Sequence, residues 1–412
     1  MKSLTKKRIV VIGGGIAGLT FISNFAKWNR SKDFEIILID AKEFFLWKPL
    51  LYHIATGSLS HEHICVKYKL YSNQLGIKFI NSNVTEMNFK DKFIKIYDLN
   101  NNSKKIIFDY LILSLGSISQ PNIKFNNLHC IDTLQNCLKL KAEVEKLILK
   151  KGEKTVVIIG GGCTGVEFCC DLRHLFRVKN IPNLSLTLIT ASNRLVTEAT
   201  ETLSQAVYHE LCNQQVSVIL NDEVLEENDG LILTKNGLRI KGDLIVWAGG
   251  IQPVNCLANM VKLKKADNNF ILTNKFTQSE SFDNIFAIGD CSTIPYCVHK
   301  GKQYFVPARG SAAYQSGYYL AKSFLSIVNK QKCKNFKYKQ VGLILSLGTQ
   351  SIGNLLCGNR AELLISGFFS KLLYYFIIFR TYKNIFGWKQ IFLMFRKGLI
   401  KKIFFSSKKI NW

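Results

Sequence analysis

Acidic side chains are scarce in this sequence of 412 residues, which holds 29 Asp and Glu against 55 Lys and Arg. The formal charge of +26 favours an anionic partner, whether a membrane surface, a nucleic acid or an anionic cofactor. Because Lys, Asn, Ile and Phe are frequent along the whole chain, compositional drift explains part of the excess equally well. Apolar residues make up 47% and charged residues 20%, which argues against disorder and fits two or three globular domains.

Paired metal-binding cysteines and long apolar runs are also missing, and no signal peptide is expected. The twelve cysteines include no pair of Cys-x-x-Cys motifs, so no metal site is expected. Most of them lie in apolar runs typical of buried free thiols in a reducing compartment. An apolar strand begins by about Arg8, so no signal peptide is expected before it. The longest uncharged apolar run near the C-terminus, 372–379, is far shorter than the roughly 20 residues of a spanning helix, so the chain is not expected to cross a membrane.

A glycine turn near the N-terminus is the clearest functional signal. An apolar run leads directly into Gly13, Gly15 and Gly18, spaced Gly-x-Gly-x-x-Gly, and a helical apolar pattern follows. In such a unit the glycines permit the tight turn, the approach of a pyrophosphate and close packing of helix on strand. The helix N-terminus adds unpaired N–H groups that attract phosphate. The next apolar strand ends in Asp40, where a carboxylate can bind a ribose hydroxyl, so the stretch predicts a dinucleotide site.

A second unit of the same kind follows about 147 residues later. An apolar strand leads into Gly160, Gly162 and Gly165, again followed by a helix, which predicts a second dinucleotide site on the same chain. The next apolar strand ends in Thr190 instead of a carboxylate, and Arg194 comes four residues later.

Apolar patterning predicts the remaining elements. Strands are expected at 79–84, 93–97, 106–108, 109–116, 184–190, 216–220, 231–233, 239–240, 243–250 and 284–289. Helices are expected at 138–151 and from 306 to about 327. The aromatic stretch 44–52 contains Pro49, which forbids a regular helix, so a loop laid over a flat apolar group is expected there.

Several short segments carry more specific motifs than the glycine turns alone, beginning with Leu-Trp-Lys-Pro-Leu-Leu at 46–51 and Ala-Thr-Gly-Ser-Leu at 55–59. The others are 160–167, 246–251, 285–291 and 345–348. In this order they resemble the flavoproteins with two dinucleotide-binding domains. Within that group the chain resembles the type II NADH dehydrogenases, single-subunit NADH:quinone oxidoreductases that do not pump protons. The resemblance covers most of residues 7–360.

The resemblance implies an α/β fold with two Rossmann-like dinucleotide-binding domains, for FAD and NADH, and a C-terminal membrane-binding helical segment. The expected FAD-binding domain is discontinuous and comprises 1–118 and 284–366, and the NADH-binding domain comprises 119–283. Residues 367–412 are the expected amphipathic membrane-associating segment.

The resemblance also implies the cofactor contacts. Asp40 would bind the adenosine ribose of FAD and Asp290 would lie near its ribityl chain and pyrophosphate, while Lys48 and the backbone near Val84 would lie along it. The expected cofactor-binding residues for the two dinucleotides are Gly13, Gly15, Gly18, Asp40, Lys48, Val84, Gly116, Asp290, Ala312, Gly160, Gly162, Gly165, Glu167, Gly249 and Gly250.

The implied reaction has two stages: NADH gives a hydride to FAD, and two electrons and two protons then pass to a quinone. Glu167 is expected where nicotinamide and then quinone approach the flavin, and its carboxyl could relay protons. Alternatively, Glu167 is a first-turn acid favoured by the helix dipole. The family has Ala-Gln where this chain has Gly310-Ser311, whereas Gln315, one turn later, matches. The expected catalytic residues are therefore Glu167, Gln315 and Ser311, with the quinone-side contact altered at Ser311.

A second departure concerns the nucleotide. The family carries an acid where this chain has Thr190, and a carboxylate there repels a 2′-phosphate. Its loss beside Arg194 predicts a relaxed preference for NADH, with NADPH as an alternative donor.

Cysteines sort the rival flavoenzymes. Disulfide reductases of this fold have a reactive cysteine pair soon after the first acid, but residues 41–60 contain no cysteine. Sulfide:quinone oxidoreductases use distant cysteines, which Cys130 and Cys357 could mimic, but they lack the second glycine turn. A flavoenzyme with a soluble acceptor and a catalytically idle basic binding protein also remain open. No RNA-binding signature is found, so nucleic acid is not expected.

The C-terminal tail has no acidic residue from 363 to 412. Aromatic and aliphatic residues alternate there with Lys and Arg, a pattern typical of helices that lie in a membrane interface. The expected partners are anionic lipid and a membrane quinone, on the cytoplasmic face of the inner membrane if the source is bacterial. A core-packing or dimer-forming helix pair is the alternative, and a homodimer stays open.

Overall fold

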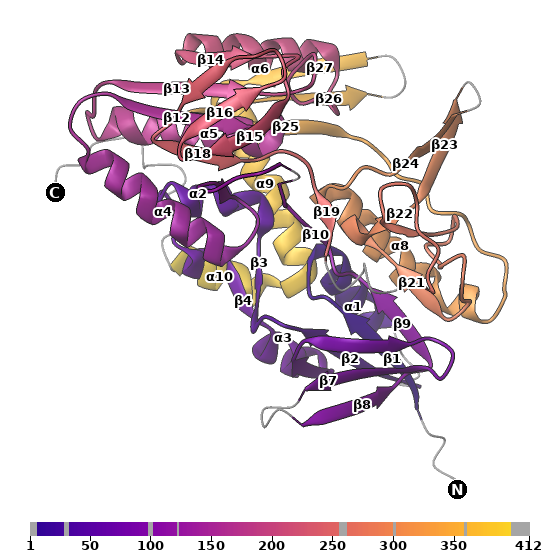
Figure 1. Ribbon diagram of the computed structural model, residues 1–412. Coiled ribbons are helices and arrows are strands. Elements are labelled where there is room, and N and C mark those ends of the chain that lie inside the picture. Colours follow the sequence, from indigo (N-terminus) through magenta and orange to yellow (C-terminus); the bar gives the residue numbers. More distant parts are fainter. Residues whose placement is uncertain are drawn as a thin grey trace, which may run out of the picture.

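Two five-stranded parallel sheets dominate the computed structural model, which describes residues 6–28, 33–97, 102–121, 123–254, 262–299, 302–357 and 361–396 (Figure 1). The first sheet has the order β21 (Ile285–Ala287), β9 (Tyr110–Leu113), β1 (Lys7–Ile12), β2 (Phe34–Asp40) and β5 (Lys78–Asn81). The second has the order β11 (His129–Cys130), β18 (Leu244–Trp247), β12 (Lys154–Ile159), β13 (Leu184–Ile189) and β14 (Val216–Ile219). In each, the strand before a glycine turn lies at the centre, which confirms the predicted α/β fold with two Rossmann-like units.

Register and burial explain why these strands are so apolar. Ile9 to Ile12 on β1 pair in parallel with Ile36 to Ile39 on β2, and all of these residues are buried. A parallel sheet that is covered on both faces gives no polar face to any strand, so apolar residues run on without alternation. Strands of this kind end where the glycine turns begin, and the sheets thereby fix both turns at their carboxyl edges.

Smaller antiparallel sheets complete the β-structure. Three of them have three strands: β6 (Val84–Asn88), β7 (Phe93–Tyr97) and β8 (Ser103–Ile107); β15 (Val224–Asn228), β16 (Leu231–Thr234) and β17 (Arg239–Lys241); β25 (Gly342–Leu347), β26 (Gln350–Cys357) and β27 (Ala361–Ser366). The short pairs are β3 (Phe44–Leu46) with β4 (Cys65–Lys67), β10 (Ser117–Ile118) with β19 (Gln252–Pro253), β20 (Ile271–Leu272) with β22 (Ser292–Thr293), and β23 (Pro295–His299) with β24 (Lys302–Phe305).

The helices pack around these sheets. They are α1 (Ile16–Trp28), α2 (Leu51–Ala55), α3 (Tyr68–Leu75), α4 (Leu134–Leu149), α5 (Cys163–Val178), α6 (Glu201–Asn213), α8 (Gly310–Val328), α9 (Gly367–Phe386) and α10 (Trp388–Arg396), with 3₁₀ turns at Lys48–Leu50, His61–His63 and Gly289–Cys291. Helices α1 and α8 approach each other closely, since a Cβ on Gly317 would lie 2.3 Å from the Ala17 carbonyl oxygen. Glycine is therefore required where these two helices cross.

The stretch 44–52 is not the predicted loop. It forms β3, a 3₁₀ turn with Pro49 in its first positions, and the start of α2. Proline is compatible with the first turn of a helix because the N–H groups there have no partner within the helix. The motif thus places residues 51–55 on a short helix, which becomes important at the active site.

The C-terminal segment is part of the core as well as of the surface. One face of α9 is buried, including Tyr374, Tyr375 and Tyr382, so the core-packing alternative is correct for that face. The other face carries exposed Phe369 and Phe376, and α10 adds an exposed Phe392. Residues 397–412, with their further Lys and Phe, lie outside the described part of the chain. Among the described helices, none has the length and apolarity that crossing a membrane requires.

Candidate active site

The first glycine turn leaves space only where a ligand would need it. A Cβ on Gly13, which has φ +100°, would lie 2.3 Å from the Ser114 carbonyl oxygen, and a Cβ on Gly18 would lie 2.3 Å from that of Gly13. Both positions therefore require glycine for the fold itself. By contrast, a Cβ on Gly15 would meet no atom closer than 4.0 Å, so the space beside it is open to a phosphate.

Asp40 lies directly beside this turn. Its Oδ2 accepts a hydrogen bond from the Gly14 N–H (2.6 Å), and its Oδ1 accepts one from the Lys42 N–H. The hydroxyl of Tyr68 on α3 stabilises the turn by donating to the Gly14 carbonyl (2.8 Å). The sequence patterns did not identify this residue. The predicted ribose-binding acid and the predicted phosphate-binding turn are thus joined in one structure.

Asp290 and Lys48 are linked through Ser117, close to the carboxyl end of β21 in the same sheet. Burial raises the pKa of Asp290, against the opposing effects of Lys48 and a hydrogen bond from the Ser117 hydroxyl (3.4 Å). Burial lowers the pKa of Lys48, whose ammonium donates to the Ser117 carbonyl (2.9 Å). The other oxygen of Asp290, Oδ1, is buried and has no hydrogen-bond partner among the described residues. Such an acceptor suits a hydroxyl of a polyol chain, so this edge fits the FAD that the sequence predicts.

The other residues predicted for FAD frame this edge. Gly116 follows β9 with φ +71°, and a Cβ on it would come within 4.0 Å of Lys48 Nζ. Ala312 is buried in the first turn of α8. Val84 begins β6 and packs against the core of the first sheet.

The second glycine turn repeats this geometry. A Cβ on Gly160, with φ +121°, would lie 2.5 Å from Ala248, and a Cβ on Gly165 would lie 2.1 Å from the Gly160 carbonyl oxygen. No atom lies within 4 Å of a Cβ on Gly162. Gly249 and Gly250 follow β18 at the same edge of the sheet. The two turns therefore share one design, with the open glycine in the middle position of each.

Thr190 occupies the position at which the sequence pattern lacks the expected carboxylate. It is buried at the end of β13, and its side chain lies beside Gly161, where a Cβ would meet it at 3.0 Å. Arg194 donates to the carbonyl oxygens of Ala199 (3.0 Å) and Thr197 (2.7 Å), within its own loop. The guanidinium of Arg194 is thus held by its own loop, and the predicted effect on NADPH depends on the missing acid at Thr190 alone.

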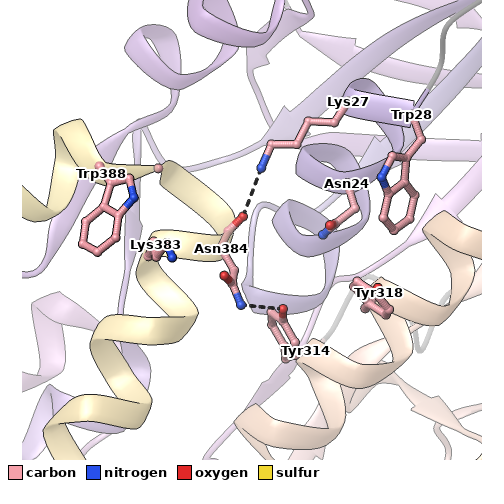
Figure 2. Close-up of a pocket in the computed structure, with 9 residues that line it drawn as sticks. Asn24, Lys27, Trp28, Tyr314, Tyr318, Lys383, Asn384 and Trp388 are labelled. Atoms are coloured by element: carbon pink, nitrogen blue, oxygen red, sulfur yellow. Dashed lines mark hydrogen bonds between the residues drawn. The ribbon is translucent and has the colours of Figure 1, made fainter.

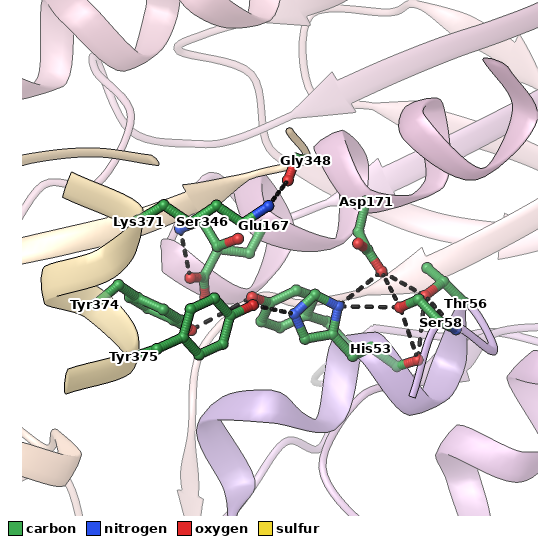
Figure 3. Close-up of polar contacts among 11 residues, drawn as sticks. His53, Thr56, Ser58, Glu167, Asp171, Ser346, Gly348, Lys371, Tyr374 and Tyr375 are labelled. Atoms are coloured by element: carbon green, nitrogen blue, oxygen red, sulfur yellow. Dashed lines mark hydrogen bonds and ion pairs between the residues drawn. The ribbon is translucent and has the colours of Figure 1, made fainter. Parts of the chain in front are cut away.

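Glu167 is buried where α5, β25 and α9 meet (Figure 3). Its Oε1 accepts the backbone N–H of Ser346 (3.0 Å), and its carboxyl also bonds the Tyr374 hydroxyl. Burial raises the pKa of Glu167 to about 8, and the nearby Asp171 adds to the shift, against the two hydrogen bonds. The carboxyl therefore holds a proton at neutral pH and can exchange it near pH 8. The alternative of a helix-dipole acid would favour the ionised form instead.

Gln315 and Ser311 lie apart from this carboxyl, on α8. The Gln315 side chain is tied to the backbone of Lys339, donating to its carbonyl (3.0 Å) and accepting from its N–H (2.9 Å). The Ser311 hydroxyl lies 3.4 Å from the hydroxyl of Tyr338. No described hydrogen bond joins either residue to Glu167, so the structure places the three predicted catalytic residues on two separate helices.

A second buried acid, Asp171, lies one turn after Glu167 on α5 and was missed in the sequence. Its Oδ2 accepts from the hydroxyls of Thr56 and Ser58 (2.8 Å for Ser58) and lies 3.1 Å from His53 Nδ1 (Figure 3). Burial would raise the pKa of Asp171, but the charge and hydrogen bond of His53, with the two hydroxyls, hold it below its usual range. The only available sequence signal was a second acid four residues after Glu167 inside an apolar helix.

Three buried or half-buried cysteines have raised thiol pKa values, which disfavours the reactive thiolate. Burial raises the pKa of Cys130 to about 11, which disfavours the thiolate. Burial likewise raises the pKa of Cys169 and Cys291, each to about 12. The side chain of Cys357 lies outside the described residues, so the pairing considered for Cys130 stays untested.

Known proteins share both sequence and architecture with this chain. The family model of the pyridine nucleotide-disulphide oxidoreductases matches residues 7–317. The type II NADH:quinone oxidoreductase of Haemophilus influenzae is 30% identical, over 85% of this chain and 87% of that protein. NDH2 from Plasmodium falciparum, solved in complex with NADH, superposes with a TM-score of 0.82 at 19% identity, covering 98% of this chain and all of that one. The sulfide:quinone oxidoreductase of Aquifex aeolicus superposes with a TM-score of 0.78 at 19% identity, over 96% and 95%.

Proposed function

The chain belongs to the type II NADH:quinone oxidoreductases, flavin-dependent NADH dehydrogenases of the pyridine nucleotide-disulphide oxidoreductase family, and on that premise we propose its full reaction. It passes a hydride from NADH to FAD and then two electrons to a membrane quinone, without pumping protons, and so feeds a respiratory chain. The observation that carries this proposal is the pair of glycine turns at corresponding edges of the two sheets, with the proton-holding Glu167 on the helix of the second turn.

The residues present fit both nucleotides. The first turn, Asp40, Lys48 and Asp290 would hold FAD, while the turn at Gly160 to Gly165 would hold NADH, in line with the domain division predicted from the sequence. FAD, when bound, supplies the two-electron chemistry that joins a hydride donor to a quinone. The protein's own contribution is to align the two nucleotides, exclude water and hold protons.

Glu167 is the residue that holds a proton in this proposal. A quinone that accepts two electrons also takes up two protons, and a carboxyl with a pKa of about 8 can give up one at neutral pH. The backbone N–H of Ser346 and the hydroxyl of Tyr374 stabilise the ionised form that remains. Ser311 and Gln315 on α8 are proposed to contact the quinone from the other side.

A steady-state assay tests the proposed function. The purified protein, loaded with FAD, should oxidise NADH with a short-chain quinone as acceptor, with one quinone consumed per NADH. Oxidation of NADH that proceeds only with a soluble disulfide or with oxygen would instead support one of the alternative flavoenzymes.

We also propose that the exposed side of α9 and α10 rests on an anionic membrane surface. Phe369, Phe376 and Lys383 recur every seven residues, so they share one exposed face of α9. The row ends at a cavity of about 410 Å³ between α1, α8 and the α9–α10 junction (Figure 2). Lys27, Lys383 and aromatic rings, with no carboxylate, line this cavity. Tryptophan, tyrosine and lysine side chains suit the headgroup layer of a bilayer.

Changing Phe369, Phe376 and Phe392 together to serine is expected to weaken binding to vesicles containing phosphatidylglycerol at least about 100-fold. Each phenylalanine buried in lipid contributes roughly 1.5–3 kcal/mol, and none of the three is buried in the protein. Vesicle co-sedimentation measures the effect. A matched variant carries serine at Leu149, Ile107 and Leu225, which are also exposed but lie elsewhere. Equal binding by both variants would contradict this membrane face.

The second prediction concerns Thr190 and the preference for NADH over NADPH. The unaltered enzyme is expected to use NADPH as well as NADH, and Thr190→Asp should raise the ratio of kcat/KM for NADH over NADPH by at least about tenfold, because a carboxylate repels the 2′-phosphate. Steady-state kinetics with both donors measures the ratio. A strong NADH preference in the unaltered enzyme would refute the expectation.

A further inference from the structure

Two neighbouring residues on α2, Tyr52 and His53, contact two neighbouring residues on α9. Figure 3 shows His53 beside Tyr375 and Tyr374. The hydroxyls of Tyr52 and Tyr374 lie 3.3 Å apart, and Tyr374 also bonds Glu167. Beside them, the Tyr375 hydroxyl lies 3.5 Å from His53 Nε2. The two contacts fasten α9 to α2 immediately next to the proton-holding carboxyl.

Asp171, on the other side of the His53 ring, determines which nitrogen of the neutral ring carries the hydrogen. Asp171 is ionised and accepts hydroxyl donors on the same oxygen that faces His53 Nδ1. An ionised carboxylate requires a hydrogen on Nδ1, and in the neutral ring this leaves Nε2 as an acceptor. The Tyr375 hydroxyl can therefore donate to Nε2, which orients the tyrosine ring.

Tyr375 connects this pair to Glu167. Its hydroxyl also bonds the side chain of Ser346, the residue whose backbone N–H donates to Glu167. The ring of Tyr375 is 2% exposed, so it has no room to adopt another position without moving α9. The titratable groups that face His53 and its partners are, from α5, Glu167, Asp171 and His174; from α9, Lys371, Tyr374 and Tyr375; and from α2, Tyr52.

We propose that His53, oriented by Asp171, is a positioning residue for the quinone half of the reaction, because it aligns Tyr375 and Tyr374 of the C-terminal helix against Glu167. The inference rests on the proposed quinone reduction at Glu167. It assigns to the tail a role within the active site, separate from any contact with lipid.

The role predicts which half of the reaction depends on His53. Reduction of a quinone takes up protons, whereas ferricyanide accepts electrons alone. His53→Gln, Asp171→Asn and Tyr375→Phe should each lower kcat with a short-chain quinone about tenfold or more and shift the fall of this rate near pH 8, which Glu167 sets. NADH oxidation with ferricyanide should change less than about twofold. His53→Gln combined with Tyr375→Phe should be no slower than the worse single variant, since the two act as a unit.

Tyr382→Phe is the matched control. Tyr382 is a buried tyrosine of the same helix whose hydroxyl donates to the Ile64 carbonyl, outside the cluster around Glu167. If loss of a buried hydroxyl from α9 is all that matters, Tyr382→Phe and Tyr375→Phe should have the same quinone kinetics and the same pH profile. The proposal requires that only Tyr375→Phe changes the profile.

Nitrogen NMR of the full-length protein with labelled histidine rings gives a readout that does not depend on turnover. The signals missing from His53→Gln identify this ring, whose neutral form should carry its hydrogen on Nδ1 and leave Nε2 bare, and this tautomer should be lost in Asp171→Asn. Parallel loss of quinone and ferricyanide rates, or a His53 ring in the other tautomer, would overturn the inference. An unaltered enzyme that reduces ferricyanide but no quinone would instead overturn the proposed function.

Discussion

Replacing Gly162 with valine is expected to lower kcat/KM for NADH at least about 100-fold while FAD content and unfolding temperature stay unchanged. The folded structure can accommodate the larger side chain, because a Cβ on Gly162 meets no atom within 4 Å and the residue has an extended backbone (φ −77°, ψ −179°). The valine side chain instead occupies the space that a pyrophosphate needs. NADH kinetics, flavin absorbance and thermal denaturation measure the three quantities.

Two further glycine variants make this prediction specific. Gly15→Val alters the corresponding open position of the first turn, so it should abolish FAD binding and leave a colourless protein. In Gly165→Ala the new methyl group would lie 2.1 Å from the Gly160 carbonyl oxygen, so this variant should unfold at a lower temperature. If Gly162→Val loses FAD or oxidises NADH normally, the assignment of the second turn to NADH is wrong.

Glu167→Gln is expected to lower kcat with a quinone by about 10²–10⁴-fold and to remove the pH dependence near 8. Burial, the largest cause, raises the pKa of Glu167, so the carboxyl is protonated below pH 8 and loses its proton as the pH rises through that value. The quinone rate of the unaltered enzyme should accordingly fall above pH 8. Glutamine keeps the shape and accepts the Ser346 N–H, but it has no proton to give.

Reduction of the flavin by NADH provides the internal control for this variant. That step transfers a hydride and requires no carboxyl, so its rate in Glu167→Gln should stay within about twofold of the unaltered rate. Stopped-flow absorbance at the flavin band measures it. A loss of both half-reactions together would show that Glu167 acts by supporting the fold or the nucleotide, and an unchanged quinone rate would remove it from the reaction.

Local spacing made the two nucleotide turns predictable. A turn of three glycines between an apolar strand and a helix depends on residues within one short segment, so Gly13 to Gly18 and Gly160 to Gly165 could be read directly. The motif at 46–51 is equally visible, but Pro49 in it predicts an interrupted helix, whereas the proline lies in the first turn of one. Whether a proline breaks a helix depends on its position within the helix, and a linear sequence pattern does not show that position.

The cluster around Glu167 was less accessible because its contacts span the chain. His53 and Asp171 are separated by 118 residues, and His53 and Tyr375 by 322. Neither spacing belongs to any local motif. The tail shows the same limit: its aromatic and basic composition indicated a membrane surface, while the buried tyrosines of α9 reveal that the same helix completes the core. Truncation of 367–412 would therefore disturb both roles, and point variants separate them.

Anaerobic double mixing tests the central claim most directly. The purified yellow protein is first mixed with one equivalent of NADH and then with one equivalent of a short-chain quinone, while flavin absorbance is followed. The account predicts that NADH bleaches the flavin fully and that the quinone restores the colour with formation of one equivalent of quinol. A protein that takes up no flavin, or a bleached flavin that the quinone leaves bleached, would contradict it.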